Sequence, residues 1–247
     1  AYREASDLSR PQLAERLGYT PQWIGQIESG RSTPSEDFAK DCDSFFDTKG
    51  AFHRIWKWHQ QLEHIEVVPP GVRPFIEIEP GARYMRLFEP LLIPGLLQTE
   101  EYARMVLRVG QRQEKVDELL AARMARKAIL EKEHPPWLLI VLGETAVRSR
   151  AAGAEAMRGQ LQYLLDLAEL QHVTLQIFPA DAPVFQASGI VLMSLEDRSD
   201  VGFVDAAGGH GRLIEDPDDL EDLVVLFDQV RATAYSAEES ARIIRSV

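Results

Sequence analysis

The sequence contains almost no cysteine and no long apolar run, and each absence excludes a class of protein. Cys42 is the only cysteine, so an internal disulfide and a cysteine-based zinc site are both excluded. No segment reaches the roughly 18 consecutive apolar residues that a membrane-spanning helix requires. We therefore expect a cytoplasmic protein that does not interact with a membrane.

Motifs of the common enzyme classes are also missing. There is no Gly-x-Ser-x-Gly elbow, no phosphate loop ending in Gly-Lys-Ser/Thr and no His-Glu-x-x-His motif. Only Glu144 and His210 suggest catalysis. However, Glu144 is well placed to cap a helix that begins at Thr145, and the glycines around His210 favour a hairpin turn. We expect that the protein is not an enzyme and that it binds no cofactor.

A metal site is not expected either. Three histidines fall within one predicted helix, but their spacings of six and five residues place neighbouring members about 240° and 140° apart around the helix axis. Side chains on different faces cannot ligate one ion. The three are His53, His59 and His64.

Charge is distributed unevenly along the chain. The formal net charge is −12, which argues against phosphate binding by the protein as a whole. Residues 1–60 carry 8 Lys and Arg against 9 Asp and Glu, so nearly all of the excess acid belongs to the remainder. The densest acidic stretch, 215–222, is typical of a solvated helix start, and a surface for a basic partner is the alternative.

The first third of the chain predicts short helices. Ser9 and Gln12 form a capping box for one helix, and Thr20 caps the next, with Pro21 at its first position. A third helix begins at Ser35, and a fourth covers about 49–66. Three prolines and a glycine in VVPPGVRPF, residues 67–75, then predict a linker.

Residues 76–247 predict a second domain that contains both strands and helices. Runs rich in β-branched and aliphatic residues predict strands at 84–88, 137–143, 173–178, 189–195, 201–206 and 211–214. Helical periodicity predicts helices at about 100–109, 114–133, 154–170, 217–234 and 237–245. The expected fold is thus multidomain, a small all-α domain followed by a larger mixed α/β (α+β) domain.

The helix in TPQWIGQIESGR, residues 20–31, has a polar face without a charge. Gln22, Gly25, Gln26 and Ser29 share about 100° of arc, whereas Ile24 and Ile27 point to the opposite side. Glutamine can pair bidentately with adenine in the major groove. The sequence therefore predicts that Gln22 and Gln26 read bases. Two flanking arginines are expected to bind phosphates, Arg10 and Arg31.

SRPQLAERLGYTPQWIGQIESGRSTPS resembles the helix-turn-helix of phage-repressor-like, Xre/Cro-type transcription factors. The resemblance covers about residues 1–47 and implies that the first helix begins upstream of Ala1. It also implies that Arg3 forms an ion pair with Glu28. By this resemblance the helix after the turn enters the major groove of double-stranded DNA. The residues near the bases would be Pro21, Gln22, Trp23, Gly25 and Gln26.

A second resemblance covers about residues 75–247. LLIPGLLQTEEYARMVL, WLLIVLGETAVRSRAAGAEAMRGQLQYLLDLAE and VTLQIFPADAP are similar to the DUF5753 domain of antitoxin-like actinobacterial regulators. The resemblance implies a small partner protein of the DUF397 type. We expect an effector or partner site where the chain turns and the next helix starts, at Pro94, Gly95, Gln98 and Thr99.

Two functions remain open from the sequence. The first is a sequence-specific transcriptional regulator in which residues 1–66 bind DNA, as a homodimer because one short helix makes too few base contacts. Its larger domain would sense a partner or a ligand. The second is an antitoxin-like interaction protein that mainly holds a small companion. A DNA-tethered enzyme that modifies a ligand is a weaker third.

Overall fold

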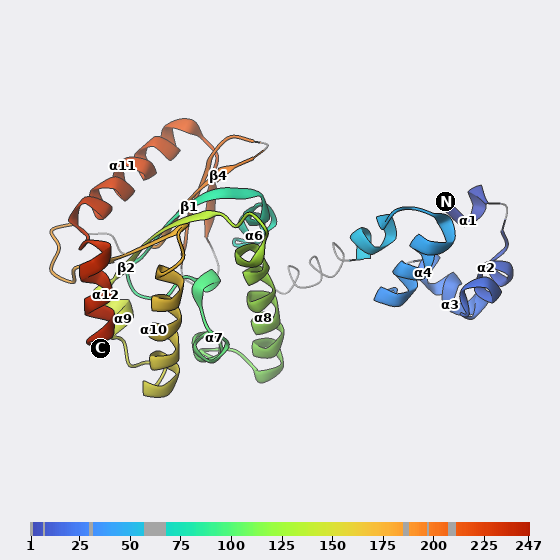
Figure 1. Ribbon diagram of the computed structural model, residues 1–247, viewed down its shortest axis with the longest axis horizontal. Helices are drawn as coiled ribbons and strands as arrows, with labels where there is room; N and C mark the ends of the chain where they lie inside the picture. Colours follow the sequence, from blue (N-terminus) through green and yellow to red (C-terminus); the bar gives the residue numbers. More distant parts are fainter. Residues whose placement is uncertain are drawn as a thin grey trace. The chain divides into compact units, whose positions relative to one another are not determined.

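The computed structural model describes residues 2–6, 8–29, 32–56, 68–184, 188–196, 198–206 and 211–247. The chain divides into two units, Ala1–Glu63 and His64–Val247. The first unit is helical and the second combines helices with one sheet, which confirms the expected fold class (Figure 1).

The helices of the first unit begin where the sequence predicts. Ser9 accepts from the backbone N–H of Gln12, and the Gln12 side chain accepts from the backbone N–H of Ser9 in return. Thr20 and Ser35 cap the next two helices through their hydroxyl oxygens. The elements are α1 (Tyr2–Ala5), α2 (Arg10–Leu17), α3 (Pro21–Glu28), α4 (Glu36–Phe46) and a helical stretch at 51–56.

A small apolar core holds these helices together. Its buried members are Leu13, Ala14, Ile24, Phe38 and Cys42. Half-buried aromatic rings pack around them, as expected for residues that supply large apolar area. One side of each helix packs into this core, and the opposite side faces solvent.

The second unit is built on a six-stranded sheet in the order β3-β2-β1-β4-β5-β6. The pairs β1–β2 and β2–β3 are parallel, whereas β1–β4, β4–β5 and β5–β6 are antiparallel. The strands are β1 (Ala82–Glu89), β2 (Trp137–Gly143), β3 (Val173–Phe178), β4 (Ile190–Leu195), β5 (Val201–Val204) and β6 (Arg212–Ile214).

Helices cover both faces of this sheet (Figure 1). Alternate strand residues such as Leu87 and Ile140 pack with α7, α8, α10 and α12, and the intervening residues such as Phe88 and Val141 pack against α11. The helices are α6 (Arg73–Ile78), α7 (Glu100–Leu107), α8 (Gln113–Arg126), α9 (Glu144–Arg148), α10 (Ala154–Ala168), α11 (Pro217–Thr233) and α12 (Ala237–Arg245), with 3₁₀ turns η1 (Glu79–Gly81), η2 (Gly95–Leu97) and η3 (Lys127–Glu131).

The stretch 67–75 differs from the linker that its prolines predict. From Val68 onward it belongs to the second unit, because Val68 and Phe75 are buried in the main core. Pro74 lies in the first turn of α6, where its missing N–H removes no hydrogen bond from the helix. One of the three prolines that suggested a linker thus lies in the first turn of a helix.

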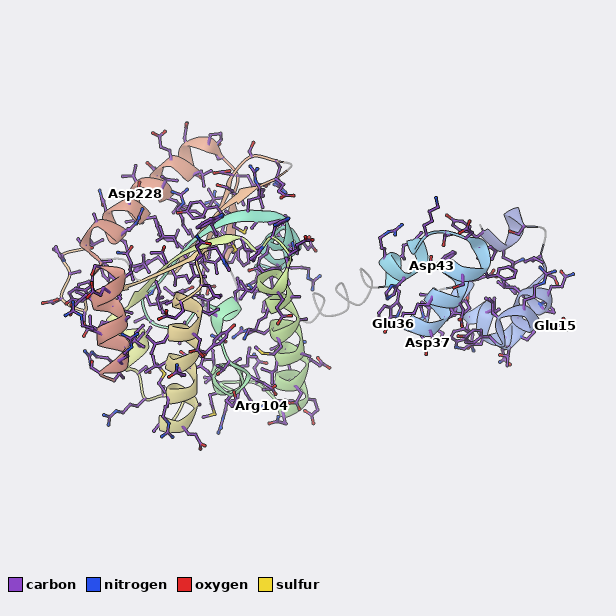
Figure 2. All side chains as sticks on the ribbon, in the orientation of Figure 1. Glu15, Glu36, Asp37, Asp43, Arg104 and Asp228 are labelled. Carbon is purple, nitrogen blue, oxygen red and sulfur yellow. The ribbon has the colours of Figure 1, made fainter. Side chains whose placement is uncertain are left out.

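The outer helices are tied together by exposed ion pairs. Arg104, labelled in Figure 2, lies on α7. It donates to Glu100 on the same helix at 3.3 Å and to Asp117 on α8 at 2.5 Å. Such exposed pairs contribute little stability individually. Among the described helices, none has the length and apolar character needed to cross a membrane.

Candidate nucleic-acid interface

The exposed face of α3 is the part of the first unit that most resembles a reading surface. Gln22, Gln26 and Ser29 are exposed, whereas Ile24 on the opposite side is only 1% exposed. Pro21 is exposed at the first helical position. The amides therefore project from a helix whose other side is fixed in the core.

Trp23 anchors this helix. Its ring stacks on Tyr19 with centroids 4.8 Å apart and meets the edge of Phe38 at the same distance. The Tyr19 hydroxyl donates in turn to Asp41 on α4 at 2.9 Å. Because its ring is half-buried in these contacts, Trp23 is less suited to base contact than the two amides.

Glu28, at the end of α3, is bound by two arginines. Arg3 donates through Nε at 2.6 Å and through Nη2 at 3.1 Å, so the expected Arg3–Glu28 ion pair is present. Arg10 donates through Nε at 2.6 Å to Oε2, the oxygen that also accepts from Arg3 Nη2. These hydrogen bonds, with that of Arg3 the strongest, lower the pKa of Glu28 despite its partial burial. The carboxylate is therefore ionised at neutral pH.

Arg10 lies beside Gly25 rather than apart from the helix. A methyl group placed on Gly25 would be 3.6 Å from Arg10 Nη1. The sequence places Arg10 and Arg31 as phosphate contacts on either side of α3. Arg31 lies outside the described residues, and Arg10 is tethered to the helix itself.

The four residues predicted to bind an effector form an interior network instead of an open site. Pro94 and Gln98 are buried, and the Gln98 amide donates to Ile93 O at 2.7 Å and accepts from Arg123 at 2.8 Å. The Thr99 backbone N–H donates to Gln160 at 2.7 Å. A methyl group on Gly95 would be 3.5 Å from Arg123 Nε and Arg126 Nη1. These residues hold the turn in place.

Of the groups considered for catalysis and metal binding, the structure describes Glu144 and His53. Glu144 does not cap its helix; it is the first residue of α9, and its carboxylate accepts from Arg148 at 2.6 Å. It lines a shallow surface pocket of about 390 Å³ with Arg148 and Ala180. His59, His64 and His210 lie outside the described residues. Within the described part of the chain, no His, Cys, Asp and Glu side chains cluster as metal ligands.

Glu89 is a partly buried carboxyl at the end of β1, and no sequence motif marks it. Burial, with a smaller effect from Asp205, raises the pKa of Glu89 to about 8. Its carboxylate occupies the space beside Gly189, where an added methyl group would be 2.2 Å from Glu89 Oε1. Burial also lowers the pKa of Arg123 to about 10. In the sequence, the only sign of this group is an acidic residue that follows Leu87 and Phe88 at the end of a strand.

Comparison with known proteins agrees with this division of the chain. Residues 1–53 match the model of a helix-turn-helix domain. Residues 72–246 match the model of a domain of unknown function, DUF5753. Searches of curated proteins and of solved structures found no match. The chain therefore belongs to the DUF5753 family, with a helix-turn-helix domain in front of the family domain.

Proposed function

We propose that the protein is a sequence-specific, DNA-binding transcriptional regulator. The observation that carries the proposal is the pair of exposed amides, Gln22 and Gln26, on a helix fixed from behind by Ile24 and Trp23. A rigid helix that presents hydrogen-bonding side chains can enter the major groove and distinguish bases. The helix-turn-helix match supports binding to double-stranded DNA.

The proposed DNA-binding form is a homodimer. One recognition helix contacts only a few base pairs, whereas a dimer reads two half-sites about 34–36 Å apart on one face of the duplex. Arg31 serves as a phosphate contact in this proposal. The acidic second unit stays off the phosphates, so the first unit makes the DNA contacts.

In this proposal the second unit has a regulatory role and no catalytic role. It binds a partner protein or a ligand, and that effector prefers one of two states of the protein and so alters DNA binding. We expect the protein to act in the cytoplasm. The rival function is that of an antitoxin-like interaction protein, whose main role is to hold a small DUF397-type partner; it is favoured by the large share of the chain that the DUF5753 domain occupies.

Selection from random duplexes, followed by footprinting, separates the two functions. The regulator must enrich one sequence with two related half-sites at a spacing near one helical turn. Failure to enrich any sequence, together with tight capture of a DUF397-type protein, supports the interaction protein. Enrichment of a single unrepeated half-site contradicts the homodimer but leaves sequence-specific binding intact.

A further inference from the structure

The arrangement of Arg10 differs from that of a flexible phosphate contact. Its side chain remains 51% exposed, yet its Nε donates to Glu28 at 2.6 Å. Among the described residues, Nη1 and Nη2 of Arg10 have no hydrogen-bond partner. The guanidinium is thus held by one edge while its other two nitrogens remain available.

The guanidinium of Arg10 lies beside position 25 of α3. A methyl group on Gly25 would lie 3.6 Å from Arg10 Nη1 and 3.8 Å from Arg10 Cζ, which is ordinary contact distance. Gly25 belongs to the exposed face that carries Gln22 and Gln26. Gly25 has no side chain, and the Arg10 side chain, which comes from α2, lies beside it on the exposed face of α3.

The carboxylate that holds Arg10 is itself fixed. Glu28 accepts two hydrogen bonds from Arg3, which is 14% exposed and also donates from Nη1 to Leu8 O at 2.7 Å. Arg3 therefore anchors Glu28, and Glu28 restrains Arg10. Fixing the planar guanidinium before binding reduces the conformational entropy lost when its remaining N–H groups form hydrogen bonds.

We propose that Arg10 reads a guanine base, through Nη1 and Nη2, rather than binding a phosphate. A guanidinium whose Nε is occupied presents two parallel N–H donors, and guanine presents O6 and N7 as two acceptors in the major groove. This pairing is geometrically specific, because no other base offers that pair of acceptors. The inference rests on the proposed function and adds guanine to the adenine recognition expected of the two glutamines.

The test begins with the wild-type protein and its selected site. Each G·C pair is replaced in turn, and binding is measured for wild type, Arg10→Lys and Arg10→Ala at several salt concentrations. At one position the wild type should prefer guanine by about 5- to 150-fold. Both variants should lose that preference and keep the preferences at other positions. The control is Arg16→Lys, the same change elsewhere on α2, where the guanidinium lies over Phe45.

A change in the DNA gives an independent test that cannot disturb protein folding. Replacing that guanine by 7-deazaguanine removes one acceptor, and the wild-type affinity should fall by about 2- to 12-fold. The same change should have no effect on Arg10→Ala. Protection of the buried Cys42 thiol from alkylation checks that each variant keeps the first unit folded.

Three outcomes would contradict the inference or the proposed function on which it rests. If Arg10→Ala keeps the guanine preference, weakens binding to all sequences equally and flattens the salt dependence by about one charge, Arg10 is a phosphate contact and the inference is wrong. If 7-deazaguanine has no effect at any position, base reading by Arg10 is also wrong. If the wild type has no preferred sequence at all, the proposed function fails first.

Discussion

Replacing Glu79 by glutamine is expected to destabilise the second unit strongly. Glu79 is 2% exposed and receives two hydrogen bonds of 2.8 Å from Arg126, which lies 5.6 Å from the ring centroid of Phe75. Glutamine keeps the volume but removes the charge, so Arg126 stays buried without a counter-ion. Breaking a buried pair in this way costs about 3–5 kcal/mol of the free energy of unfolding.

That loss is large enough to measure by calorimetry of the full chain. For a unit of this size, 1 kcal/mol lowers Tm by about 2–4 °C, so the transition of the second unit should fall by about 6–20 °C. Glu77→Gln is the matched control, because Glu77 is exposed on α6, two residues before Glu79, and its replacement should change stability by less than about 0.5 kcal/mol. Adding Arg126→Met to Glu79→Gln should recover part of the loss. Equal Tm values for Glu79→Gln and Glu77→Gln would refute this reasoning.

Three further predictions concern groups that are buried or partly buried. Burial raises the pKa of Cys42 to about 12, so its thiol should resist alkylation at pH 8 until the first unit unfolds; rapid labelling of the native protein would contradict the described core. The pKa of Glu89 is raised from 4.5 to about 8, so the folded state binds its proton more tightly than the unfolded state does, and stability is lost as pH rises from about 4.5 to 8. Urea unfolding should therefore show Glu89→Gln gaining up to a few kcal/mol on wild type between pH 5 and pH 8.5, and a gain that does not change with pH would be inconsistent. Gln160→Leu leaves Leu97 O and the Thr99 N–H without their buried partner, so it should cost about 1–3 kcal/mol per orphaned group, whereas the exposed Gln162→Leu should cost little in the same measurement.

The sequence predicted regular elements well where local patterns determine them. The expected strands at 137–143 and 173–178 and the expected helix at 237–245 agree with β2, β3 and α12. Apolar runs bounded by turn residues, and a serine before a periodic helix, are local signals. The short helix α6 was missed because prolines mark both linkers and first helical turns.

Contacts between distant residues were not predictable in the same way. Glu28 follows the pattern of a family ion pair with Arg3, but its bond to Arg10 depends on how closely α2 packs on α3. The sequence pattern of the turn at Pro94 and Gly95 suggests a binding site, but Arg123 and Gln160, which come from other helices, pack around this turn and the residues that follow it. Sequence patterns identify such residues as unusual without indicating whether they bind a ligand or each other.

The most direct test of the account is binding of the selected duplex by Gln22→Ala and Gln26→Ala at one fixed salt concentration. Each change should cost about 1–3 kcal/mol and relax the preference at one base pair, because each removes a bidentate contact from the exposed face of α3. Gln111→Ala, an exposed amide in the second unit, should bind as wild type does. Unchanged affinity and unchanged base preference in both recognition-helix variants would contradict the claim that this face reads DNA.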